Sequence, residues 1–192
     1  MIGLMIAQVI AQTLQLLFGW HVWLGGGEPP VHWTARYVDA TGSHTIEVWR
    51  QADHVRRITD GVLELDAVRP RGEPYRFSLH DRARDTTFHG REHDRILQGS
   101  FDDWQRWTHV IAPSAPGALV WPLDRPPLAT PAGRCHWLRD AGTDICWSTR
   151  LALPLVLRVA GTDVYTVRTA EPLRRPVPPF TPTGTEVVVD DD

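Results

Sequence analysis

The chain has 192 residues, of which 42% are hydrophobic, and its formal net charge is −3 at pH 7. This size and hydrophobic content suit one compact domain, and the absence of a basic excess argues against a nucleic acid partner. Sixteen prolines and fifteen glycines favour many turns over long helices.

The N-terminal residues form an uncharged apolar run, which predicts a membrane anchor over residues 1–24. From Leu4 to Leu24 the run spans 21 residues, and as a helix it would be about 31 Å long, close to the thickness of a bilayer's hydrocarbon core. Trp20 and Trp23 lie at its end, where membrane interfaces favour amphipathic rings. A cleaved signal peptide and a buried core helix are the alternatives, but a basic n-region and a small-x-small cleavage site are not evident.

Three glutamines, Gln8, Gln12 and Gln15, interrupt this run with helical spacing. They would lie along one stripe of a helix, and an unpaired amide is costly in lipid. The stripe therefore predicts an interface with another membrane helix, although a single span also tolerates glutamines. GGGEPP, residues 25–30, follows as a flexible linker before the extracytoplasmic domain that we expect over residues 31–192.

Residues 31–90 alternate between apolar and polar side chains, with turn residues between the runs. Strands are expected at HWTARYV, HTIEVWR, HVRRI, VLELDAV and YRFSLH. Asp60 and Gly61 form a strong signal for a two-residue hairpin turn. The region therefore predicts a meander of five or six antiparallel strands with one apolar and one solvated face.

The middle of the chain, residues 95–112, spaces its apolar residues as a helix does. We expect short helices whose aromatic side chains cover the open face of the sheet. A proline-rich connector follows, with one strand near residues 119–123. Strand patterns then return at RCHWL, DICWST, PLVLRV, DVYTVR and EVVV. The predicted fold class is therefore mainly β (α+β), a curved antiparallel sheet with short covering helices, preceded by one N-terminal transmembrane helix.

Cys135 and Cys146 are the only cysteines. If the hairpin loop between them runs from Arg139 to Gly142, the cysteines lie directly opposite each other, about 4.5 Å apart at Cα and within disulfide range. A metal clip or a redox pair would favour C-x-x-C spacing. We therefore expect a structural disulfide, with two reduced buried cysteines as the alternative. A disulfide would place the domain outside the cytoplasm, in agreement with an N-terminal membrane or export segment.

HGREH, from His89 to His93, matches the H-x-x-E-H pattern of one class of zinc peptidases. That chemistry requires the motif on a helix, whereas here His89 ends a probable strand and Gly90 follows it. A glycine-rich phosphate loop and a G-x-S-x-G elbow are also missing from the sequence. We therefore expect no metal, no cofactor and no enzymatic activity.

Aromatic side chains are abundant, with nine tryptophans. Ordinary core packing would explain them. Alternatively, they line an apolar groove between a curved sheet and its covering helices, a natural site for an acyl chain or a lipidated peptide. The residues for this core or groove are Trp33, Tyr37, Trp49, Phe77, Phe101, Trp104, Trp107, Trp137 and Trp147.

The order of an export segment, a long meander, a helical plug and closing strands resembles the LolA-like family. The phrase DICWSTRLALPLVLRV, with its Leu-Pro-Leu, and the later VYTV and PPFTPTG segments carry the resemblance over about residues 31–189. That superfamily includes periplasmic lipoprotein carriers and lipid-binding lipoproteins. The resemblance implies a curved half-barrel closed by helices around a hydrophobic cavity, without catalytic residues. The anchored relatives use a lipidated cysteine, whereas this chain has no N-terminal cysteine.

Two functions follow from these patterns. The first is a non-enzymatic, membrane-tethered domain on the periplasmic face that binds a lipid, a lipoprotein or another acylated partner. The second is an accessory subunit of a larger membrane protein complex, anchored by its N-terminal helix, in which the cavity is simply a filled core. In both, the membrane is a partner of the chain.

Overall fold

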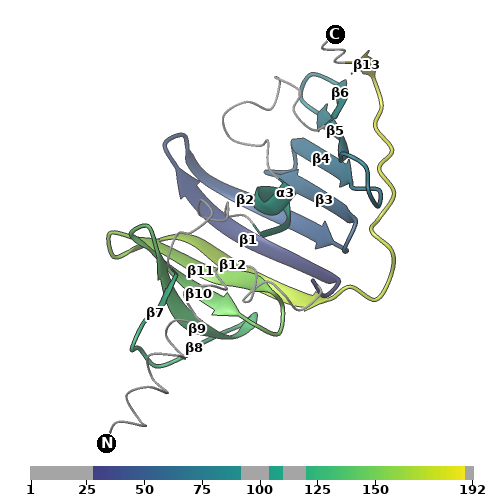
Figure 1. The fold of residues 1–192 in the computed structure, drawn as a ribbon. Coiled ribbons are helices and arrows are strands. Elements are labelled where there is room, and N and C mark those ends of the chain that lie inside the picture. Colours follow the sequence, from purple (N-terminus) through teal and green to yellow (C-terminus); the bar gives the residue numbers. More distant parts are fainter. Residues whose placement is uncertain (1–27, 92–103, 110–119, 189–192) are drawn as a thin grey trace, which may run out of the picture.

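The computed structural model describes residues 28–91, 104–109 and 120–188, which are mainly β (Figure 1). The predicted anchor, with Gln8, Gln12 and Gln15, lies outside these residues. Within the described ranges, no helix has the length and apolar character needed to cross a bilayer.

The strands fall into two meanders. The first comprises β1 (Val31–Asp39), β2 (Gly42–Arg50), β3 (His54–Thr59), β4 (Leu63–Val68), β5 (Arg76–Asp81) and β6 (Thr86–Arg91). Helix α3 and two short strands follow, namely α3 (Trp104–His109), β7 (Trp121–Pro122) and β8 (Leu128–Thr130). The second meander comprises β9 (Gly133–Asp140), β10 (Thr143–Ser148), β11 (Leu153–Val159) and β12 (Thr162–Pro172), and the last strand is β13 (Thr185–Val188).

All these strands join one open sheet in the order β13-β6-β5-β4-β3-β2-β1-β12-β11-β10-β9-β7, with β8 also paired to β9. Strand β1 pairs with β12 and so connects the two meanders. The meander predicted over residues 31–90 is confirmed, with six strands. The sheet is uncurled, in contrast to the half-barrel that the resemblance implies, because its edge strands β7 and β13 stay at opposite ends of the sheet (Figure 1).

One face of the first meander, called the inner face here, is apolar because alternate side chains of each strand point to it. Trp33 and Val48 are fully buried there. Helix α3 covers this face with Trp107, whose ring centroid lies 5.0 Å from that of Tyr75 and 5.9 Å from that of Phe77. The predicted aromatic helix on the sheet is therefore confirmed for the residues of α3.

The two central strands of the second meander bury side chains on both of their faces. Strands β10 and β11 each carry five consecutive buried residues. Unbroken apolar runs such as Leu153–Leu157 are typical of strands that are covered on both sides.

A buried arginine connects three parts of the fold. Arg50 ends β2 on the inner face and is fully buried. Its guanidinium donates hydrogen bonds to the main-chain oxygens of Thr108 in α3 (2.9 Å) and of Leu151 (2.6 Å) and Ala152 (2.9 Å) before β11. Burial lowers the pKa of Arg50 to about 10, against the opposing effect of Glu28. The group therefore stays charged at neutral pH and holds the helix and the second meander to β2.

The C-terminal strap, residues 173–184, leaves β12 and crosses to β13 at the far edge of the sheet (Figure 1, yellow). The main-chain nitrogen of Leu173 donates to the oxygen of Pro30 (3.0 Å), and Nη1 of Arg56 donates to the oxygen of Pro179 (2.8 Å). On β3, Arg56 lies between Val55 and Arg57, whose buried side chains point to the inner face, so the side chain of Arg56 points to the opposite face. The strap therefore crosses the face of the sheet opposite α3.

Gly184 fixes the end of the strap against the turn between β5 and β6. Its φ is +86°, and a Cβ at this position would lie 2.0 Å from the main-chain oxygen of Asp85. That oxygen accepts a hydrogen bond from the nitrogen of Thr185 (2.9 Å). We expect Gly184→Ala to detach β13 from β6 and to speed amide exchange across β13 by about tenfold or more, as measured by hydrogen exchange with mass spectrometry.

Gly72 provides the matched control for this change. Its φ of +79° resembles that of Gly184, but a Cβ there would meet no atom within 4 Å. Gly72→Ala therefore carries the same left-handed cost, about 1–2 kcal/mol, without a clash. Protection of β13 that is equal in the two variants would contradict the proposed role of Gly184.

Candidate functional site

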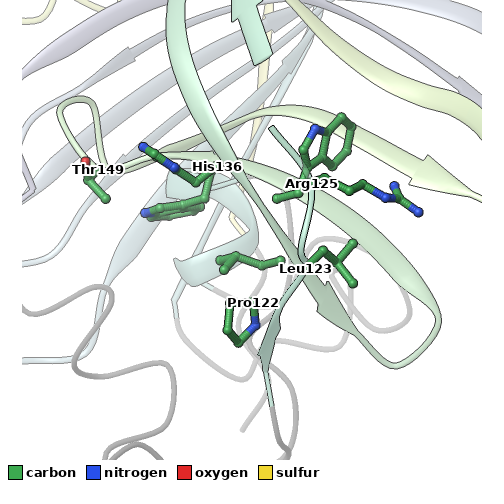
Figure 2. Close-up of a pocket in the computed structure, with 8 residues that line it drawn as sticks. Pro122, Leu123, Arg125, His136 and Thr149 are labelled. Carbon is green, nitrogen blue, oxygen red and sulfur yellow. The ribbon is translucent and has the colours of Figure 1, made fainter. Parts of the chain in front are cut away.

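A pocket of about 350 Å³ opens at the β7 edge of the sheet, between the segment after β7 and strands β9 and β10. Its volume lies at the lower end of the range for ligand pockets, roughly 300–1,000 Å³. In Figure 2, His136 and Thr149 lie on one side and Arg125 on the other, with Pro122 and Leu123 below. The lining is mostly apolar and consists of Pro122, Leu123, Arg125, His136, Trp137, Leu138, Trp147 and Thr149.

Two connections hold the walls of this pocket. The main-chain nitrogen of Leu123 donates to the oxygen of Trp137 (2.9 Å), which keeps the segment after β7 against β9. The Sγ atoms of Cys135 and Cys146 lie 2.11 Å apart, at the distance of a disulfide bond. Because Cys146 lies opposite Trp137 in the β9–β10 register, this link joins the two strands directly beside the pocket.

The expected cysteine pair is therefore brought together, but the expected register was wrong. The turn consists of Ala141 and Gly142 alone, with φ values of 43° and 87°, instead of four residues. Cys146 lies opposite Trp137, and Cys135 precedes Trp137 by two residues on β9. The link is therefore diagonal, with Cα atoms 5.2 Å apart. Diagonal neighbours lie on the same face of a sheet, which is why this shift still permits the contact.

A cluster of charged side chains lies at the mouth of the pocket. Arg125 Nη1 donates to Asp144 Oδ2, and Arg139 Nε donates to Asp144 Oδ1, both at 2.7 Å. The hydrogen bond from Arg139, followed by that from Arg125, lowers the pKa of the Asp144 carboxyl. The carboxylate therefore stays ionised at neutral pH, and two guanidiniums share one negative charge.

Trp137 links this cluster to the apolar wall. Its ring centroid lies 5.8 Å from Cζ of Arg125 and 4.9 Å from Cζ of Arg158, within the range of cation–π contacts. Arg158 in turn donates from Nε to Asp163 Oδ1 (2.6 Å). The aromatic wall and the cations at the mouth therefore form one connected unit.

The structure places the predicted aromatic residues in different surroundings. Trp137 and Trp147 line the pocket. Tyr37 and Trp49 are partly buried and stack on histidine rings, and Phe101 lies outside the described residues. The remaining four are buried in the core of the inner face, namely Trp33, Phe77, Trp104 and Trp107.

The H-x-x-E-H motif does not have the helical setting that its zinc chemistry requires at its first residue. His89 lies on strand β6, and its Nδ1 is 2.8 Å from Oγ of Ser78. Glu92 and His93 lie outside the described residues. Across residues 28–91, 104–109 and 120–188, no three His, Cys, Asp or Glu side chains gather as metal ligands.

No protein-family model, curated protein or solved structure matches this chain. The resemblance to the LolA-like family therefore rests on sequence pattern alone.

His44 connects two hairpin turns away from the pocket. Its Nδ1 lies 2.7 Å from Oδ2 of Asp60, and its Nε2 lies 3.2 Å from Oδ1 of Asp39. The hydrogen bond to Asp60 is the main cause that raises the pKa of His44 above its ordinary value of 6.5. The same network lowers the pKa values of Asp39, mainly through Thr41, and of Asp60, mainly through the amide of Thr45.

This arrangement predicts a pH dependence of stability. Because the folded-state pKa of His44 is raised, its contribution is complete below pH 6.5 and is lost as the pH rises through the folded-state pKa. The wild-type free energy of unfolding should therefore decline between pH 6.5 and the folded-state pKa of His44. We expect His44→Gln to reduce this decline, as measured by urea denaturation across a pH series. Identical profiles for wild type and His44→Gln would contradict the prediction.

Proposed function

We propose that this protein is a non-enzymatic domain, tethered to a membrane on its extracytoplasmic side, that binds the acyl chain of a lipid or of an acylated protein. The pocket between β7, β9 and β10 carries the proposal, because its walls are mainly Trp137, Trp147, Leu123 and Leu138. The uncharged N-terminal run and the cysteine pair at disulfide distance support the location.

The size of the pocket suits a single chain and a reversible interaction. Burial of about ten methylenes would contribute roughly 8 kcal/mol of gross transfer free energy. Association opposes this with about 4 kcal/mol or more of lost translational and rotational freedom. The balance corresponds to moderate affinity, as expected of a domain that takes up and releases its ligand.

The test uses a neutral probe, a twelve-carbon alcohol with a photoreactive diazirine in its chain, added to the full-length protein in phosphatidylcholine nanodiscs. We expect crosslinks within residues 121–149, mapped by mass spectrometry. Thr149 is exposed at the pocket wall, so Thr149→Trp should fill the mouth without disturbing the core and should lower labelling by about tenfold. Thr162→Trp, at an exposed threonine outside the pocket lining, should label as wild type.

The second function, an accessory subunit of a membrane complex, gives a different result in the same assay. Labelling of the segment would then be equally weak in wild type and in Thr149→Trp. That outcome would overturn the proposal of an acyl-chain pocket, and co-purification of membrane-protein subunits through the N-terminal segment would then favour the accessory role.

A further inference from the structure

We propose that the pocket takes an anionic amphiphile, a molecule with one apolar chain and a carboxylate or phosphate head, and that Arg125 holds this head at the mouth. The inference rests on the proposed function and names the class of its ligand. It depends on the position of Arg125, on the charge balance around Asp144 and on the apolar wall beside them.

Arg125 belongs both to the pocket lining and to the solvent-facing mouth. Its side chain contacts the cavity, while its guanidinium is turned outward in Figure 2 and the side chain is 40% exposed. Its Cζ lies 5.8 Å from the ring centroid of Trp137, which forms part of the cavity wall. An amphiphile with its chain against Trp137 would therefore keep its head in water, within reach of this guanidinium.

The local charge favours an anion at this point. Arg125 and Arg139 share the single carboxylate of Asp144, so the three side chains together carry one excess positive charge. A guanidinium has five N–H donors, and Nη1 of Arg125 donates one to Asp144. The outward donors can form the paired, charge-assisted hydrogen bonds with which arginine recognises carboxylates and phosphates.

Arg139 offers a matched control for Arg125. Both donate to Asp144 at 2.7 Å, and both side chains are partly exposed, at 40% and 48%. Arg125 lines the pocket, whereas Arg139 is not part of the lining. Replacing either residue with glutamine removes one positive charge and one partner of Asp144, so a difference between the variants reports on position and not on net charge.

The experiment compares two photoreactive probes on the full-length protein in phosphatidylcholine nanodiscs, a twelve-carbon carboxylate and the matching alcohol. We expect wild type and Arg139→Gln to label residues 121–149 about tenfold more strongly with the carboxylate, as a charge-assisted hydrogen bond would give. Arg125→Gln should lose this preference and should still label with the alcohol. Excess unlabelled dodecanoate should compete with the carboxylate probe, whereas the same concentration of inorganic phosphate should not.

The outcomes separate this inference from the function on which it rests. Equal labelling of wild type by both probes, blocked by Thr149→Trp, would overturn the anionic head and leave the acyl-chain pocket standing. Equal loss of preference in Arg125→Gln and Arg139→Gln would assign the effect to net charge and would overturn the role of Arg125. Competition by inorganic phosphate as strong as that by dodecanoate would show an anion site without a chain and would overturn the amphiphile. Failure of both probes to label the pocket would overturn the proposed function itself.

Discussion

Arg50→Met is expected to lower the free energy of unfolding by about 3–5 kcal/mol, because it leaves several buried carbonyl oxygens without their donor. The guanidinium donates hydrogen bonds to the main-chain oxygens of Thr108, Leu151 and Ala152. The methionine thioether has no hydrogen to donate to them. Urea denaturation followed by circular dichroism measures the change. Because the three oxygens belong to α3 and to the segment before β11, we also expect faster amide exchange in both places.

Arg76→Met is the control for this prediction. The side chain of Arg76 is 64% exposed, and its ion pair with Glu73 is long, at 3.8 Å. A surface change of this kind is usually within about 0.5 kcal/mol of wild type. A loss of stability in Arg50→Met no larger than in Arg76→Met would show that the buried guanidinium does not hold the two parts of the sheet together.

Replacing both cysteines with alanine is expected to lower the free energy of unfolding by about 3 kcal/mol. Cys135 and Cys146 are separated by 11 positions, and closing a loop of this size restricts the unfolded chain by about that amount. Wild-type protein in reductant should approach the stability of the double variant in the same denaturation experiment. The pocket should also label less strongly, since the link joins β9 and β10 beside Trp137.

Thiol counting provides an independent check on this link. Both cysteines are buried, so the native protein is unfolded in denaturant together with an alkylating reagent and without reductant. This sample should contain no alkylated cysteine, whereas denatured and reduced material should contain two per chain. Two alkylated thiols in the sample without reductant would contradict both the disulfide and the extracytoplasmic location inferred from it.

The strands could be predicted from the sequence because each one carries its own local signal. Alternation from Trp33 to Tyr37 marks an inner and an outer face of β1, and Asp60-Gly61 supplies the positive φ values that the β3–β4 turn needs. The pairing of β1 with β12 has no such signal, since it depends on residues that are at least 128 positions apart, the separation of Tyr37 and Tyr165. The half-barrel expectation failed at this level, because the curvature of a sheet depends on how distant edges meet.

The pocket was only partly visible in the sequence. Trp137 and Trp147 stood out as aromatic candidates, but Leu123 and Arg125 lie in a proline-rich connector without periodicity. The main-chain nitrogen of Leu123 donates to Trp137 on β9, and that of Arg125 donates to the oxygen of Leu123. Such backbone hydrogen bonds leave no pattern in the order of the side chains. Arg50 was missed for a related reason, because a charged residue that ends a strand normally lies in solvent.

The strap that connects β12 to β13 has a consequence for how the chain matures. Strand β1 pairs with β12, and β6 pairs with β13. Both edges of the first meander therefore pair with strands that are synthesised last. Until then the first meander exposes two unpaired borders that could recruit other nascent chains. Pairings this remote in sequence also slow the search for the native topology. We therefore expect biogenesis to depend on holding factors that shield the first meander until synthesis is complete.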